Sequence, residues 1–310
     1  MKLSCLVAAI VSSLSTFAAA AEFPDSAAFV CGMGEVFVID VERDGPGQIQ
    51  KLWSWKGAER EDVPAGLRRQ FATTDDCKSV RNGERVLISS SSGGCALVEV
   101  STGRVLWTET VPAAHSIELL PGERIVVAAS TAGKGGGDRL VLFNAHAKGE
   151  PLWTGPLHSA HGVVWDAERQ RLWAIGFDAL QEYELAEWDG AKPSLRLAGS
   201  FPLPSEGGHD LQPVPGTDDL ILSTHDHVEL FSRATRTFHR HPTIGDLTHV
   251  KSAMIHPSNG RLMCVQASEQ QWWTSELRLL NPDVRRSLAT EKIYKARWVL
   301  TGASERSGSP

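Results

Sequence analysis

Histidine recurs at one position of an internal repeat in this chain. His115, His161 and His209 each lie nine or ten residues before the end of a polar turn, and an apolar or alternating segment typical of a β-strand follows each turn. By the same count, Asp76 and Lys251 hold this position in the preceding and following copies. Equivalent positions of a circular repeat fold converge on one axis. We therefore expect these five side chains to surround one opening.

A second signal supports the repeat. Trp53, Trp107 and Trp153 each belong to a Leu-Trp-Ser/Thr triplet, at intervals of 54 and 46 residues. A period of about 40–50 residues with several short strands predicts an all-β propeller. Six blades of four antiparallel strands fit the length, and a seven-bladed propeller, with shorter blades, is the alternative. The expected blades span residues 27–57, 71–111, 114–157, 160–203, 208–242 and 250–282.

The first blade is short of one strand, and residues 292–299 near the C-terminus are expected to supply it. Such a closing strand joins the two ends of the chain and removes exposed sheet edges. The predicted organisation is a signal peptide over residues 1–21, a single propeller domain over 22–303 and a loose tail over 304–310.

Composition and the N-terminal segment bound the function. The 310 residues carry a formal net charge of −6 with no basic stripe, which argues against a nucleic-acid partner. Met1-Lys2, an apolar run from Leu3 to Phe17 and four alanines have the form of a secretory signal. We expect a periplasmic or secreted monomer that has no membrane association after cleavage.

Four cysteines remain after the predicted cleavage: Cys31, Cys77, Cys95 and Cys264. Export permits disulfides. Cys77 and Cys95 fall in one predicted blade, and Cys31 is placed to approach Cys77 from the neighbouring blade. Four separate buried thiols are the alternative.

The three histidines are the candidate metal ligands. Neutral imidazole binds transition metals well, and imidazoles from adjacent blades are placed to share one divalent ion such as manganese, zinc or iron. The open positions of that ion would then take water or substrate. Two alternatives remain: histidines that only hydrogen-bond turns, and a metal-free site for an anionic ligand.

Lys251, His225 and Asp76 are the candidate catalytic residues. Lys251 is predicted to clamp a substrate carboxylate or act as a base, or else to form an ion pair with Asp76 across the opening. His225, in the loop between the second and third strands of the fifth blade, is a candidate fourth ligand or proton shuttle, with a solvated loop histidine as the favoured alternative.

Other residues are candidates for support and substrate binding. Glu118 is predicted to orient a ligand histidine through its second nitrogen, and Asp210 and Gln212 are weaker candidates for the same task. Trp272 and Trp273 are candidates for stacking on a substrate, with blade packing as the alternative. Arg297 is expected to add positive charge for substrate binding.

Several segments carry a family resemblance. Residues 114–121, 160–166 and 207–211, with Val250-Lys251-Ser252 and residues 272–275, resemble the signature segments of an uncharacterised family of exported bacterial propellers. This resemblance implies a propeller fold and no settled activity.

Two looser resemblances concern activity. The propeller oligogalacturonate lyases hold manganese with three histidines and a glutamine, roles that His115, His161, His209 and Gln212 match by residue type. Those lyases have seven blades and a different ligand spacing. Residues 102–107 resemble one blade of a quinone-dependent dehydrogenase, and too few blades share that pattern to imply a quinone.

The predicted function is an exported, metal-dependent propeller enzyme. It would be a lyase or hydrolase that acts on a sugar acid, oligosaccharide or lactone. The alternative is a propeller that binds a glycan, another ligand or a protein at the same opening without turnover.

Overall fold

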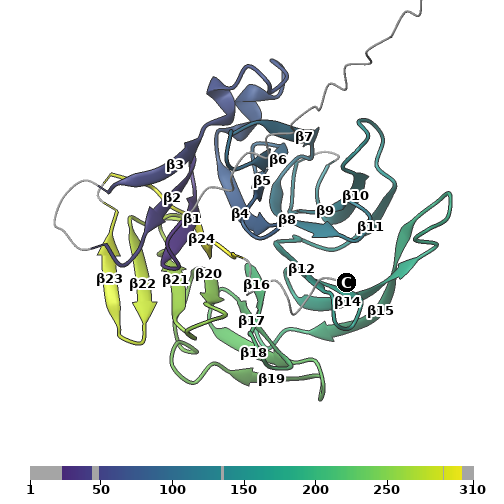
Figure 1. Ribbon diagram of the computed structural model, residues 1–310. Coiled ribbons are helices and arrows are strands. Elements are labelled where there is room, and N and C mark those ends of the chain that lie inside the picture. Colours follow the sequence, from purple (N-terminus) through teal and green to yellow (C-terminus); the bar gives the residue numbers. More distant parts are fainter. Residues whose placement is uncertain (1–22, 44–48, 134–135, 289, 302–310) are drawn as a thin grey trace, which may run out of the picture.

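The chain forms a six-bladed β-propeller. The computed structural model describes residues 23–43, 49–133, 136–288 and 290–301. Within these ranges, twenty-four strands form six four-stranded antiparallel sheets around one axis (Figure 1). The six-bladed prediction is confirmed, and the described residues leave no seventh blade. The predicted signal peptide and the predicted tail over 304–310 lie outside the described residues.

The strands of each blade run in order from the axis outward, and blade one begins with the last strand of the chain. The blades are β24 (Lys295–Trp298), β1 (Ala27–Cys31), β2 (Val36–Asp40) and β3 (Lys51–Trp55); β4 (Thr74–Val80), β5 (Arg85–Ser90), β6 (Gly94–Glu99) and β7 (Val105–Thr110); β8 (Ala114–Leu120), β9 (Arg124–Ala129), β10 (Arg139–Asn144) and β11 (Trp153–Pro156); β12 (Gly162–Asp166), β13 (Arg171–Ile175), β14 (Ala179–Ala186) and β15 (Ser194–Pro202); β16 (Asp210–Pro213), β17 (Asp219–Ser223), β18 (Val228–Ser232) and β19 (Thr237–Arg240); β20 (Val250–Ile255), β21 (Leu262–Gln266), β22 (Glu276–Leu280) and β23 (Val284–Ser287). Two short 3-10 helices, η1 (Gly57–Glu59) and η2 (Arg68–Phe71), link blade one to blade two.

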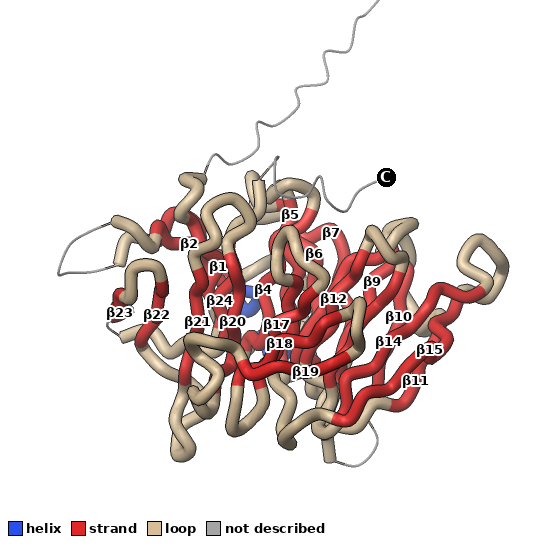
Figure 2. Tube along the Cα trace, turned by 90° about the horizontal axis from the view of Figure 1, so that it is seen from below, coloured by secondary structure: helices blue, strands red, loops and turns tan. Residues whose placement is uncertain are grey.

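Burial follows the position of each strand in its blade. Every residue of β4 and β1 is buried, whereas the outer strands β15, β19 and β23 are largely exposed. β1 has neighbours on both faces and is a continuous apolar run, whereas the innermost strand β4 is buried with polar residues such as Asp76 and Lys78. Outer strands border solvent and show polar alternation. Loops gather at the two ends of the blades (Figure 2).

The predicted closure is confirmed. β24 pairs antiparallel with β1, from Ala28 opposite Trp298 to Cys31 opposite Lys295. The C-terminal strand therefore becomes the innermost strand of the first blade. This pairing covers an edge of β1 that would otherwise be free to bind another strand.

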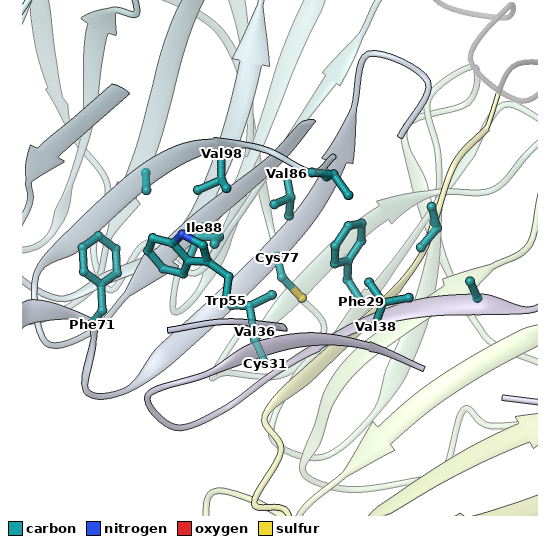
Figure 3. Packing of buried hydrophobic residues seen from close by; sticks show 14 of the residues in the cluster. Phe29, Cys31, Val36, Val38, Trp55, Phe71, Cys77, Val86, Ile88 and Val98 are labelled. Atoms are coloured by element: carbon teal, nitrogen blue, oxygen red, sulfur yellow. The ribbon is translucent and has the colours of Figure 1, made fainter. Parts of the chain in front are cut away.

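The hydrophobic core is divided among the contacts between blades. Six clusters of buried residues are present in the described part of the chain, one at each blade-to-blade contact. Figure 3 shows the cluster between blades one and two, with Phe29 and Trp55 from one blade and Val86 and Ile88 from the next. Because the last contact joins blade six to blade one, the ring is closed by packing as well as by pairing.

The cysteines lie inside these clusters. Cys31 and Cys77 share the cluster between blades one and two, as their blade positions predicted. All four cysteines of the described residues are buried free thiols, so neither predicted pairing is formed in this structure.

The repeated tryptophan belongs to the outermost strand of three blades. Trp53, Trp107 and Trp153 lie in β3, β7 and β11. Each tryptophan contacts the next blade. Nε1 of Trp53 donates to the carbonyl of Val100 at 2.8 Å, and the ring centroids of Trp107 and Trp153 lie 5.7 Å from that of Phe143 and 6.1 Å from that of Tyr183, respectively. In each triplet the tryptophan therefore packs the outermost strand of its blade against the next blade.

Candidate functional site

One residue next to the start of each innermost strand occupies the same place in all six blades. In blades two, three and six it is the extra residue of a β-bulge. In blades four, five and one its amide bonds the carbonyl at the end of the second strand. We call these residues the mouth ring: Asp75, His115, His161, His209, Lys251 and Tyr294.

The three histidines and Lys251 hold equivalent positions, as the repeat predicted, but the predicted register of blade two is wrong by one residue. Asp75, not Asp76, lies in the ring. Val80 pairs with Arg85, which leaves four residues in that turn, whereas the equivalent turn of blade three has three. A count back from Arg85 therefore ends one residue late. The segment Asn82-Gly83, in which both residues have positive φ, marks the longer turn and was the available signal.

The imidazoles form a continuous row. Ring centroids are 4.3 Å apart for His115 and His161, and 5.0 Å apart for His161 and His209. His225, from the loop between β17 and β18, extends the row with its centroid 4.9 Å from that of His209. The three histidines, which are distant along the chain, lie together as predicted. His225 lies beside them.

Hydrogen bonds fix the orientation of two of these rings. Nδ1 of His115 lies 2.8 Å from the carbonyl oxygen of Ala113, and Nδ1 of His161 lies 2.8 Å from that of Ser159. A carbonyl oxygen only accepts, so each Nδ1 carries a proton, and in the neutral form of each ring the lone pair is on Nε2. This is the tautomer that a carbonyl commonly imposes on a metal-binding histidine.

His209 has a different environment. Its Nε2 lies 2.9 Å from Nζ of Lys251, and its Nδ1 is buried without a hydrogen-bond partner in the described structure. No bond joins Lys251 to Asp76 among the described ion pairs; Asp76 pairs with Arg297 instead. Lys251 therefore contacts His209 and does not form the predicted ion pair with Asp76.

The electrostatic surroundings keep the central imidazoles neutral. Burial, followed by repulsion from neighbouring cationic groups, lowers the pKa of His161 and of His209 well below the ordinary value. Burial also lowers the pKa of His225. The ammonium of Lys251 is disfavoured in the same way: burial, with a smaller effect of Lys295, lowers its pKa to about 8. Neutral rings have the lone pairs that a metal or a hydrogen-bond donor needs.

The residue types of the mouth ring suit a transition metal, but the side chains are not arranged around one common point. Given a Zn–N bond of about 2.1 Å, three imidazoles on a tetrahedral ion stand with centroids about 5 Å apart. The two distances in the row are close to this value. In the described ranges, however, no group of three or more His, Cys, Asp or Glu side chains is arranged to hold an ion. The rings would have to turn about their side-chain torsions to coordinate one.

An aromatic pair adjoins the sixth member of the ring. Tyr294, which the sequence analysis missed, packs edge-on against Trp272 with centroids 5.8 Å apart. Trp272 is 43% exposed, whereas Trp273 is partly buried under Nζ of Lys292 at 4.6 Å. Of the two tryptophans predicted for substrate stacking, Trp272 is the more open and lies beside the ring. The pairing of β24 with β1 is what places Tyr294 there.

Below the mouth ring, a buried charge cluster fills the channel. Nε of Arg297 lies 2.9 Å from Asp76, and its two terminal nitrogens lie 2.9 and 2.5 Å from Asp210. Nζ of Lys295 lies 3.3 Å from Asp210. We call these four side chains the channel plug. Burial alone would raise the pKa of both carboxyl groups, but Arg297 and then Lys295 outweigh it, so both pKa values are lowered.

The channel plug corrects two predictions. Arg297 is 1% exposed and bound to two carboxylates, so it does not add free positive charge to the mouth. Asp210 binds Arg297 and the amide of Ala253, not a ligand histidine. The predictions for Arg297 and Asp210 were wrong because successive residues of an innermost strand lie at different depths along the channel, and the sequence does not show that depth.

The remaining predicted residues face the other end of the channel. Oε2 of Glu118 lies 3.0 Å from Nζ of Lys78, and Glu118 has no described bond to a histidine. Gln212 lies at the same depth. Together with Lys78 and Arg297 they border a cavity of about 770 Å³. All innermost strands run in one direction, so this cavity opens opposite the mouth ring.

The fold, the mouth ring and this cavity define a six-bladed propeller with a plugged axial channel. The chain belongs to the family of unknown function DUF6528, whose model matches residues 17–305. This agrees with the resemblance to an uncharacterised propeller family. No curated protein matches the chain. In the described residues, no helix has the length and apolarity needed to span a bilayer.

Proposed function

We propose that the chain is an exported propeller that binds a divalent transition metal at the mouth ring and acts there on a sugar acid, oligosaccharide or lactone. One observation carries the proposal: imidazoles from three successive blades contact one another. His115 and His161 would bind through Nε2, whose lone pair their carbonyl bonds leave free. His209 would bind through Nε2 after displacing Lys251.

The surrounding side chains suit a substrate of this class. A bound metal would lower the pKa of a water molecule or polarise a carboxylate or carbonyl group, which serves hydrolysis or β-elimination. Lys251, beside His209, would hold the carboxylate of a sugar acid. The open face of Trp272 would stack on a pyranose ring.

A second candidate is a metal-free binding propeller. The exposure of Trp272 favours it, as does the finding that no described group of three or more His, Cys, Asp or Glu side chains is arranged to hold an ion, since a sugar needs hydrogen bonds and an aromatic surface but no ion. This candidate uses the same opening and predicts no turnover.

Elemental analysis of the purified protein after incubation with manganese, zinc or iron and removal of free metal tests the first candidate. We expect about one ion per chain, lost in His161→Ala and retained in His146→Ala, a control at an exposed turn. No stoichiometric metal, or metal retained by His161→Ala, contradicts the metal site.

Titration of the metal-free protein with galacturonate oligomers tests the second candidate. Binding that is lost in Trp272→Ala, in a protein that retains no metal, supports a binding propeller. Absence of both metal and sugar binding contradicts both proposals for the mouth ring.

A further inference from the structure

The cavity opposite the mouth ring has the size and composition of a small-molecule site. Its volume of about 770 Å³ falls within the range of about 300–1,000 Å³ that ligand pockets occupy. The ends of the innermost strands form its walls, and the turns that follow them form its rim. The channel plug separates it from the histidines, so any ligand here is independent of the proposed metal.

The inner wall of this cavity carries an amide that the fold does not satisfy. Gln212 is 5% exposed, and its Nε2 has no hydrogen-bond partner in the described structure. A buried donor left unpaired costs about 1–3 kcal/mol. Gln212 lies in β16 and its side chain borders the cavity, so a rotation of the amide would bring Nε2 to a ligand oxygen.

A neighbouring ion pair supplies groups of both kinds. Nζ of Lys78 donates to Oε2 of Glu118 at 3.0 Å and also to the carbonyl of Val163. The Lys78 and Glu118 side chains are only 8% and 16% exposed. The cavity therefore offers the acceptor oxygens of Glu118 beside the donors of Lys78 and Gln212.

The charges around the inner wall balance. Lys78 is neutralised by Glu118, and the channel plug contains two cationic and two anionic side chains. The remaining wall includes the apolar side chains of Val164, Leu120 and Met254. An anion would gain no net attraction from these groups. A molecule whose hydroxyl groups both donate and accept, and whose carbon skeleton is apolar, matches them.

We propose that this cavity binds a small neutral polyhydroxylated molecule, of the size of a monosaccharide or disaccharide, through Gln212, Lys78 and Glu118. This site goes beyond the proposed function, because it lies at the other end of the channel and needs no metal.

Ligand-observed NMR and calorimetric titration test the proposal. The probes are glucose, galactose, mannose and maltose, with galacturonate as the charged counterpart. We expect at least one neutral sugar to bind the wild-type protein and to bind Gln212→Met at least tenfold more weakly. Gln50→Met, which changes an exposed glutamine, should bind like the wild type.

The melting temperature of Gln212→Met provides a second measurement. Methionine has a similar length and no unpaired donor, so the variant should melt at or above the wild-type temperature. A clear decrease contradicts the proposal, because it would mean that the fold already satisfies this amide.

Three binding results overturn the proposal. The first is that none of the neutral sugars binds. The second is that galacturonate binds at this cavity more tightly than every neutral sugar. The third is that binding survives in Gln212→Met and is lost in Trp272→Ala, which would assign the sugar to the mouth ring and favour the metal-free candidate there.

Discussion

Replacement of Arg297 by methionine should destabilise the propeller strongly. Arg297 is 1% exposed and is the main partner of the Asp76 and Asp210 carboxylates. Methionine keeps much of the volume but leaves two buried carboxylates with only Lys295 and, for Asp76, Lys78 to offset their charge. Removal of one partner from a buried ion pair typically costs about 3–5 kcal/mol. For a domain of this size we expect the melting temperature to fall by on the order of 10 °C.

The pH dependence of this effect has a definite sign. In the wild-type protein the pKa values of Asp76 and Asp210 are lowered, so their contribution to stability is present above the unfolded pKa of about 3.9 and is lost as the pH falls. In Arg297→Met, burial dominates and raises these pKa values, so protonation relieves the variant first. The difference in unfolding free energy should therefore be largest near pH 7 and shrink toward pH 4.

Urea unfolding at pH 7, 5.5 and 4 measures this difference. Arg285→Met is the matched control, because the Arg285–Glu276 pair is exposed and should contribute less than about 1 kcal/mol. The reasoning is refuted if Arg297→Met loses no more stability than this control at pH 7. A destabilisation that grows as the pH falls would refute it equally.

Two further predictions concern the core. Trp298→Ala should lower the free energy of unfolding by about 3–5 kcal/mol, because this side chain is 1% exposed and belongs to the closing strand. Trp272→Ala should lower it much less, because Trp272 is 43% exposed. Thermal unfolding of the two variants checks this, and equal losses would contradict the assigned closure. The four thiols should not react with an alkylating reagent in the folded protein, because all four are buried and burial raises the pKa of Cys264 to about 11. Mass spectrometry before and after unfolding measures the alkylation. Rapid alkylation of Cys264 in the folded protein would contradict its buried position.

The architecture could be predicted from the sequence because it is periodic. The recurring turns, the Leu-Trp triplets and the incomplete first blade each report a local property that every repeat must satisfy. Together they gave the number of blades, the closing strand and the convergence of the three histidines. The one register error, at Asp76, came from a single extra residue in a turn.

The depth of each residue along the channel could not be predicted in the same way. Arg297 and Asp76 are separated by 221 positions along the chain and meet only because the closing strand has one particular register. Glu118 and Gln212 contact the far cavity for the same reason. Such partners depend on how six strands align around an axis, and no single repeat contains that information.

The closing strand also constrains how the protein can be made. The partner of β1 is β24, which the ribosome synthesises last. At about 5–20 residues per second, the first blade waits roughly 13–53 s for its innermost strand. During that interval the nascent polypeptide has an uncovered sheet edge and an unsealed apolar surface. Blade one can therefore reach its native pairing only after the strands of the other five blades have been synthesised.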